Sequence, residues 1–268
     1  MSRLSERAAK NLHLIRQKKP LVHNITNLVV MNVTANALLA AGASPVMAHA
    51  QNEVHEMVTL AGSLVLNIGT LSEEWVTSML KAGKKASELG IPVVLDPVGS
   101  GATAFRTNCA KRLVENINIS VIRGNPSEIL SLAGQDARTR GVDALHTVDV
   151  AAESAIMIAQ QFKNTIAVTG PTDFVTDGRR VIRVLNGHPL MSSITGSGCM
   201  ATAIVAAFLA VDSDAVSAAS TALSFFGLAG EIAGRDSSGP GTFMVRLLDA
   251  LYSLTPEALE RGAGIVES

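Results

Sequence analysis

The chain has 268 residues, of which 47% are apolar, 17% are charged and 3% are aromatic, and its formal net charge is −1. Basic residues form no run longer than a pair, which argues against nucleic acid or an anionic membrane as a partner. The two cysteines, Cys109 and Cys199, fit neither a zinc spacing nor a disulfide framework. The N-terminal residues are charged and lack the apolar core of a signal peptide, so we expect a cytoplasmic protein.

Short apolar runs alternate with helical patterns along the first two thirds of the chain. Runs that are apolar on both faces and separated by helices are typical of a parallel sheet covered on both sides. The predicted strands are Leu21–His23, Ser44–Met47, Ser63–Asn67, Pro92–Asp96, Ser120–Arg123 and Thr165–Val168. The predicted helices among them are Ser2–Gln17, Val29–Ala41, Glu53–Leu60, Glu73–Leu89, Thr107–Val114, Pro126–Ala133 and Val148–Phe162.

The last third of the chain breaks this alternation. Asp177-Gly178 lies between two β-prone runs, Phe174–Thr176 and Arg180–Leu185, and predicts a hairpin at an antiparallel edge. Residues 24–27 and 186–189 are predicted to be loops. Since no linker, repeat or low-complexity segment interrupts the chain, we expect residues 1–268 to form one α/β domain. The three predicted C-terminal helices are Cys199–Leu209, Asp214–Ala233 and Phe243–Leu254.

Polar residues follow four of the apolar runs. They are Asn67, Asp96, Arg123 and Thr169. Ligands of open α/β sheets bind beyond the carboxyl ends of the strands, so we expect these residues to share one site.

Asp96, and a second carboxylate at Glu128, each have a structural and a chemical interpretation. Asp96, followed by Pro97, could hold Mg²⁺ through water or form an Asx-turn. Asn125, Pro126 and Glu128 make a good helix start, which alone could explain Glu128. A second carboxylate near Asp96, with Arg123 beside it, is also typical of a metal–phosphate arrangement. The sequence leaves both interpretations open, and they are compatible.

A glycine-rich stretch, Thr195-Gly196-Ser197-Gly198-Cys199, precedes a helix of small residues. The start of such a helix offers free N–H groups and a positive dipole end, which can bind an anion. Cys199 would lie in the first turn, where the dipole favours its thiolate. The alternative is a tight turn that carries a buried thiol.

Several common motifs are absent from the sequence. There is no GxxxxGK[ST] loop, no GxGxxG after the first predicted strand and no GxSxG elbow. These absences argue against a Walker-type nucleotide site, a dinucleotide oxidoreductase and an α/β-hydrolase. His188, which precedes Pro189, is interpreted as a loop residue and not as a base.

A series of short motifs extends from about Leu21 to Leu254. They are Leu21–Asn27, Gly42–Met47, Asn67–Leu71, Asp96–Gly99 with Gly101–Thr103, Arg123–Ile129, Val168–Gly170, Asn186–Met191 and Thr195–Cys199. Together and in this order they resemble the hydroxyethylthiazole kinase family of the ribokinase-like superfamily. A set of ordered motifs is far more specific than any one of them.

The resemblance implies a function and a fold. The function is ATP-dependent phosphorylation of the primary alcohol of 4-methyl-5-(2-hydroxyethyl)thiazole, a salvage step toward thiamine. The fold is a ribokinase-like three-layer sandwich with a mostly parallel central sheet, an antiparallel edge and helices on both faces. The resemblance also implies Mg²⁺ and a homotrimer with active sites at the subunit interfaces.

The resemblance also assigns roles to residues. Met47 and Gly196 would contact the thiazole, with Asn27 nearby. Arg123 and Thr169 would contact ATP phosphates, and Asp96 and Glu128 would serve the metal. Cys199 occupies the position of the catalytic residue.

At the catalytic position the wider superfamily has Asp, whereas this branch has Cys, as here. A thiol is a modest base, so we expect Cys199 to assist without being indispensable. Ser197 stands where many relatives have threonine, a change that we expect to be tolerated. Cys109, inside a predicted helix, is assigned to structure.

Three alternatives differ in class. The first is a kinase of the same fold that acts on hydroxymethylpyrimidine or a sugar. The second is a thiol enzyme with Cys199 as nucleophile, for which the sequence offers no convincing histidine partner. The third is a non-catalytic binding protein on a kinase fold, which would have no need of Asp96 and Glu128 together.

Overall fold

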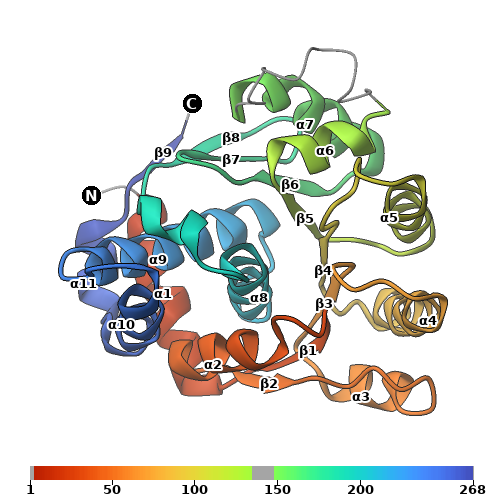
Figure 1. The fold of residues 1–268 in the computed structure, drawn as a ribbon, viewed down its shortest axis with the longest axis horizontal. Coiled ribbons are helices and arrows are strands. Elements are labelled where there is room, and N and C mark those ends of the chain that lie inside the picture. The colour runs from red at the N-terminus through yellow and green to blue at the C-terminus, as the bar shows by residue number, and fades with distance from the viewer. Residues whose placement is uncertain (1–2, 135–147, 268) are drawn as a thin grey trace.

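A sheet of nine strands runs through the part of the protein that the structure describes, residues 3–134 and 148–267 (Figure 1). The structure is a computed structural model. The strand order is β2-β1-β3-β4-β5-β6-β7-β8-β9. The strands from β2 to β6 in this order pair in parallel, and β7, β8 and β9 extend the sheet from β6 by antiparallel pairs. The strands are β1 Leu21–Ile25, β2 Ser44–Val46, β3 Ser63–Asn67, β4 Val93–Asp96, β5 Val121–Gly124, β6 Thr165–Val168, β7 Asp173–Thr176, β8 Val181–Val184 and β9 Ile265–Glu267.

Helices cover both faces of the sheet, so the predicted three-layer α/β sandwich with an antiparallel edge is confirmed (Figure 1). Helices α3 to α7 pack on one face, and α1, α2 and α8 to α11 pack on the other. The helices are α1 Arg3–Lys18, α2 Met31–Ala41, α3 Val54–Leu60, α4 Glu73–Leu89, α5 Ala104–Asn116, α6 Pro126–Leu132, α7 Val148–Phe162, α8 Ser197–Leu209, α9 Ala215–Gly234, α10 Pro240–Ser253 and α11 Pro256–Gly262, and a 3₁₀ helix, η1, spans Pro189–Ser193.

The two faces of the sheet differ in the size of their side chains. Successive strand residues point to opposite faces, so Leu64 and Leu66 pack toward α3 to α7 whereas Val65 packs toward α8. On the α8 face the central strands present small residues, including Val94 and Ala167. Helix α8 is itself rich in alanine and buried from Met200 onward. Small residues on both partners let α8 lie close to the sheet, and this fixes the position of its first turn.

Several predicted boundaries were wrong. Strand β1 extends to Ile25, so Asn24 is a strand residue and not part of a turn. Helix α2 begins at Met31, and it is not buried throughout, because Leu39 is exposed. Helix α5 begins one turn earlier than predicted, because the Thr103 side chain accepts the N–H of Arg106 and caps it. The predicted start of the first helix, Ser2, lies outside the described residues.

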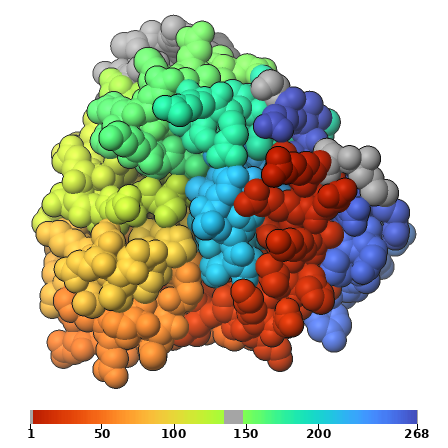
Figure 2. All heavy atoms as spheres, turned by 180° about the vertical axis from the view of Figure 1, so that it is seen from behind, coloured from red at the N-terminus to blue at the C-terminus, as the bar shows by residue number. Residues whose placement is uncertain are grey.

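The C-terminal region contains elements that were not predicted. Helix α11 starts at Pro256 with Thr255 as its cap, a signal that the sequence carried. Strand β9 pairs with β8, and of its residues only Ile265 is buried, so no period-2 pattern reveals it. Helix α1 packs against α11, and Figure 2 shows the N-terminal segment in red beside the C-terminal segments in blue.

Helix α9 is long and apolar enough to cross a membrane by composition. Within the described part of the chain it is the one helix that passes this test, and 83% of its most apolar window is buried inside the protein. It packs against α8 and α10. This burial is typical of the central helix of a hydrophobic core.

Candidate active site

The carboxyl ends of six adjacent parallel strands bring the predicted site residues to one edge of the sheet. Met47 and Asn27 follow β2 and β1, and Thr169 follows β6, while Asn67, Asp96 and Arg123 belong to the ends of β3, β4 and β5. The period-2 alternation turns the last three toward the face covered by α8, because Val65, Val94 and Val121, two residues earlier, point there. The shared site predicted from the strand ends therefore forms where α8 begins.

Asp96 is the most buried member of the site, with no exposed surface. Its Oδ2 accepts hydrogen bonds from Asn67 Nδ2 and from Thr202 Oγ1, both at 2.8 Å. Arg123 Nη1 lies 3.7 Å from Oδ1, which has no hydrogen-bond partner. Burial raises the pKa of Asp96 to about 6; the charge of Arg123 opposes this rise and the charge of Glu128 adds to it. The side chain bonds to β3 and α8 and does not form the alternative Asx-turn.

Cys199 lies in the first turn of α8, as predicted. Its Sγ accepts hydrogen bonds from Asn67 Nδ2 at 3.1 Å and from Asn27 Nδ2 at 3.6 Å. The expectation of a thiolate was wrong: burial, and then the charge of Asp96, raise the pKa of Cys199 to about 12. The two amide donors oppose this rise without reversing it, so the side chain is a thiol at neutral pH.

The start of α8 is open to an anion. Gly196 precedes the helix with a φ of +85°, in the left-handed region that glycine tolerates, and no side chain caps the helix. The first backbone hydrogen bond of the helix is donated by Met200 N–H to Gly196 O at 2.8 Å. A Cβ on Gly198 would lie 2.5 Å from Arg123 Nη1, so the guanidinium passes directly over this turn. Backbone N–H groups and a cation therefore converge here, as phosphate binding requires.

Arg123 also reaches the loop after β6. Its Nη2 donates to Thr169 Oγ1, and the predicted pair is thus in contact. Asp173, at the start of β7, stabilises this loop, because its Oδ1 accepts the Gly170 N–H at 3.0 Å. Asp173 was not among the predicted residues, although it follows Thr169 by four positions and directly precedes the predicted hairpin strand Phe174–Thr176.

Glu128 forms the predicted capping box of α6. Its Oε2 accepts the Asn125 N–H at 2.8 Å, and Asn125 Oδ1 accepts the Glu128 N–H at 2.9 Å. Its Oε1 accepts the Gly99 N–H at 2.9 Å, which ties the loop after β4 to α6. Both carboxylate oxygens thus have structural partners, each with further acceptor capacity.

The side chains around Asp96 fit the requirements of a Mg²⁺ ion in a phosphoryl-transfer site. Among the described residues no three or more His, Cys, Asp or Glu side chains form a cluster that could hold a metal by themselves. Mg²⁺ in a phosphoryl-transfer site needs only one or two carboxylates, with water and phosphate oxygens completing its shell. The unpartnered Oδ1 of Asp96, buried and near the charge of Glu128, fits this requirement.

Comparison with known proteins identifies the family. The model of the hydroxyethylthiazole kinase family matches residues 12–257. The chain belongs to this family. A hydroxyethylthiazole kinase from Desulfotalea psychrophila is 63% identical over all of this chain and 98% of its own, and one from Desulforudis audaxviator is 53% identical over 99% of this chain and 97% of its own. The predictions of the family and of an enzyme that phosphorylates hydroxyethylthiazole with ATP are thereby confirmed.

Solved structures agree with this assignment. The hydroxyethylthiazole kinase protein of Pyrococcus horikoshii matches with a TM-score of 0.90 and 45% identity, over 98% of this chain and 99% of its own. A ribokinase-like superfamily protein from Enterococcus faecalis has a TM-score of 0.66 at 12% identity and covers 92% of this chain and 89% of its own. An ADP complex of Bacillus subtilis pyridoxal kinase has a TM-score of 0.61 at 18% identity, with 80% and 92% covered. The last two show the ribokinase-like fold alone.

Met47 lies further out along the sheet of this kinase. It follows β2, the strand on the far side of β1, so one strand, β1, separates its strand from the strand of Asn67. The next residue is fixed from β1, because His23 Nε2 lies 2.7 Å from the carbonyl oxygen of Ala48. Burial lowers the pKa of His23, so its neutral ring donates this bond. The segment that carries Met47 is therefore anchored to the sheet.

The remaining residues with potential chemistry have structural roles. Cys109 is buried in α5, where burial raises its pKa to about 11. His188 Nδ1 accepts the Leu190 N–H at 3.3 Å, and its ring stacks on Phe243. These positions agree with the sequence analysis, which assigned Cys109 to structure and interpreted His188 as a loop residue.

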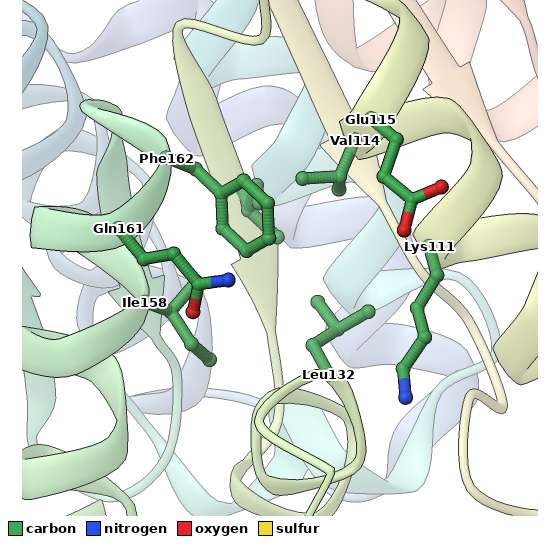
Figure 3. A pocket seen from close by; sticks show the side chains of 8 residues that line it. Lys111, Val114, Glu115, Leu132, Ile158, Gln161 and Phe162 are labelled. Atoms are coloured by element: carbon green, nitrogen blue, oxygen red, sulfur yellow. The ribbon is translucent and has the colours of Figure 1, made fainter.

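A cavity of about 180 Å³ lies away from the site (Figure 3). Apolar side chains of α5, α6 and α7 close it, and Lys111, Glu115 and Gln161 lie at its rim. The lining residues come from the second half of α5 and the last turns of α7, which return toward the amino ends of the strands. None of the predicted site residues lines this cavity.

Replacing Asp173 with Asn tests the electrostatic cost of holding the loop after β6. Asp173 is 9% exposed, and burial raises its pKa to about 7, against about 3.9 in an unfolded chain. Between these pH values the native state holds more protons than the unfolded state, so this group makes stability fall as pH rises. Asn retains an acceptor for the Gly170 N–H and does not titrate. We expect the stability advantage of Asp173→Asn over the wild type to grow by roughly 1–3 kcal/mol between pH 5 and pH 8.

Urea unfolding at both pH values, at one protein concentration, measures this difference. Asp149→Asn, at an exposed ion pair with Arg183, controls for the loss of one negative charge. A difference that is the same at both pH values would show that the Asp173 carboxyl is not strained by its burial.

Proposed function

We propose that this enzyme transfers the γ-phosphoryl group of Mg-ATP to the primary alcohol of 4-methyl-5-(2-hydroxyethyl)thiazole, a salvage step toward thiamine. The observation that carries the proposal is one buried chain of contacts. It joins Asn27, Asn67, Cys199 and Asp96, and it ends at Arg123 above the uncapped start of α8. An acceptor site, a thiol, a carboxylate and a phosphate site thus adjoin one another.

Arg123 and Thr169 bind the phosphates in this proposal. The guanidinium supplies positive charge beside the N–H groups of the first turn of α8, where charge on the transferring group accumulates. Thr169 Oγ1 holds Arg123 from the other side. Phosphoryl transfer depends on positioning and charge stabilisation more than on covalent chemistry, so such a site supplies the larger part of catalysis.

Asp96 and Glu128 would hold Mg²⁺, which when bound neutralises phosphate charge. Asn67 and Thr202 donate to Oδ2 of Asp96 and leave Oδ1 without a hydrogen bond, with Arg123 Nη1 3.7 Å away. Burial excludes water from this carboxylate, which strengthens its interaction with a cation. The capping box fixes the orientation of Glu128.

Met47, Asn27 and Gly196 would bind the thiazole, so that its hydroxyl points at Cys199. Because Cys199 holds its proton at neutral pH, its sulfur orients the hydroxyl and does not act as a strong base. The loose transition state of phosphoryl transfer makes little demand on a base before the P–O bond forms. Cys199 therefore assists the reaction without being indispensable.

An assay of ADP release tests the proposed reaction. Purified protein with Mg-ATP should release ADP only when hydroxyethylthiazole is present, and chelation of divalent cations by EDTA should abolish the release. Hydroxymethylpyrimidine and ribose serve as parallel acceptors. ADP formed with one of these would show that the enzyme is a kinase of the same fold and site that acts on another substrate. Absence of acceptor-dependent ADP from a folded sample would contradict the reaction and favour the thiol-enzyme or binding-protein alternative.

Cys199→Asp tests the role of the thiol. A carboxylate at this position is ionised at a lower pH than the thiol and can accept the proton of the hydroxyl, so we expect kcat to be retained within about tenfold or to rise. The steady-state kcat for the thiazole measures this effect, and Cys109→Ser is the matched control at a buried structural cysteine. A folded but inactive Cys199→Asp enzyme would show that the sulfur itself is required.

We further propose that the enzyme is a cytoplasmic homotrimer, with active sites at the subunit interfaces. Leu28 and Val29 directly follow Asn27 and are 66% and 68% exposed, and large exposed apolar residues beside a site are typical of an interface. Sedimentation equilibrium should give the mass of three chains. Leu28→Lys should shift the mass toward the monomer and lower activity in parallel, and a monomeric wild type with full activity would contradict the proposal.

A further inference from the structure

The role of Asn67 in the proposed reaction has so far been that of a donor to Asp96, yet all of its polar atoms are engaged. The side chain is 1% exposed at the end of β3. Its Oδ1 accepts from Gly69 N–H at 3.0 Å and from Asn27 Nδ2 at 2.9 Å. Its Nδ2 donates to Asp96 Oδ2 at 2.8 Å and to Cys199 Sγ at 3.1 Å. A four-fold satisfied amide at the centre of a site defines the geometry of its neighbours.

The orientation of this amide follows from its partners. A backbone N–H can only donate, so the atom that faces Gly69 is the oxygen, and the NH₂ group must face Asp96 and Cys199. Both N–H bonds are then used, one by each partner. The sulfur is therefore an acceptor toward Asn67, and toward Asn27 at 3.6 Å, so the thiol hydrogen points away from both amides.

We propose that Asn67 is a positioning residue for phosphoryl transfer, which fixes the Cys199 sulfur against the Asp96 carboxylate and keeps the thiol hydrogen available to the accepting hydroxyl. The proposal rests on the proposed function for the identity of the reaction. It accounts for a contact that joins three elements: β3 carries Asn67, its neighbour β4 carries Asp96 in register with it, and α8 carries Cys199.

Without Asn67 the thiol has a competing partner. Asp96 Oδ2 would lose one of its two donors and keep Thr202, and Cys199 would lose its nearer amide. Oδ2 is the Asp96 oxygen that shares Asn67 Nδ2 with Sγ, whereas Oδ1 faces Arg123. Once Asn67 is removed, the freed lone pair of Oδ2 accepts the hydrogen of the thiol. The S–H bond would then turn toward Asp96 and away from the acceptor. Asn67 prevents this by occupying both groups at once.

A double-mutant cycle tests the proposal. We expect Asn67→Ala to lower kcat roughly 10- to 100-fold, as loss of a supporting partner typically does, with KM for ATP and the thiazole changed less than about threefold. In a Cys199→Ala background the same substitution should lower kcat less than about threefold. Thr202→Val is the matched control, because Thr202 Oγ1 donates to the same Asp96 oxygen, and its other contact is Gly198 O and not Sγ, so its effect should be equal in both backgrounds.

The infrared S–H stretching band gives a second readout that does not depend on turnover. In a Cys109→Ser background only Cys199 absorbs, and Asn67→Ala should shift its band to lower frequency as the thiol donates to Asp96. This shift is measurable even if the enzyme uses another acceptor, so failure of the proposed function and failure of this proposal are distinguishable. Asn67→Ser, which can still donate to one partner, replaces Asn67→Ala if the latter does not fold. An unshifted band, or an equal loss of kcat in both Cys199 backgrounds, would overturn the proposal.

Discussion

The buried carboxylate of Asp96 is the constraint on which the site depends. A carboxylate without exposed surface needs hydrogen-bond donors and a compensating charge, because burial disfavours its ionised form. The donors are Asn67 and Thr202, and the charge is that of Arg123 at 3.7 Å. These partners come from β3, α8 and β5, so the strand order, the register of β3 with β4 and the distance of α8 from the sheet must all be correct together.

The alternation along the strands explains why these partners meet, and part of it can be predicted from the sequence. Residues two positions before Asn67, Asp96 and Arg123 are valines that face α8, so the three polar side chains share that face. The alternation of short apolar runs with helices was sufficient to predict the parallel sheet and the edge that carries the site, and Asp177-Gly178 predicted the antiparallel hairpin. The period-2 geometry of a strand also places Asn67 on the same face as Val65, a signal that strand ends alone do not carry.

The errors at Cys199 and β9 have a common physical cause, because both concern interactions between distant segments, whereas the missed caps of α5 and α11 are local signals. The dipole of α8 favours a thiolate at Cys199, an effect worth at most about 2 kcal/mol, and this was visible in the sequence. Burial and the nearby Asp96 charge, which raise the pKa, become visible only when β4 and α8 are placed side by side. Strand β9 likewise exists because β8 offers it a partner, and its own residues carry little β signal. Thr202 is one more buried helix residue in the sequence, and its role follows only from the 2.8 Å contact with Asp96.

The glycines of the site show how backbone and side chains share this narrow space. Gly196 and Gly198 belong to one motif but are required for different reasons. Gly196 has a positive φ, which reverses the chain into α8, whereas Gly198 leaves room for the Arg123 guanidinium. Gly69 does the same for Asn27, whose Nδ2 would lie 2.6 Å from an added Cβ. Two of the three glycines thus make room for polar side chains, Arg123 from β5 and Asn27 from the loop after β1, so the Gly-Ser-Gly pattern reflects the packing of Arg123.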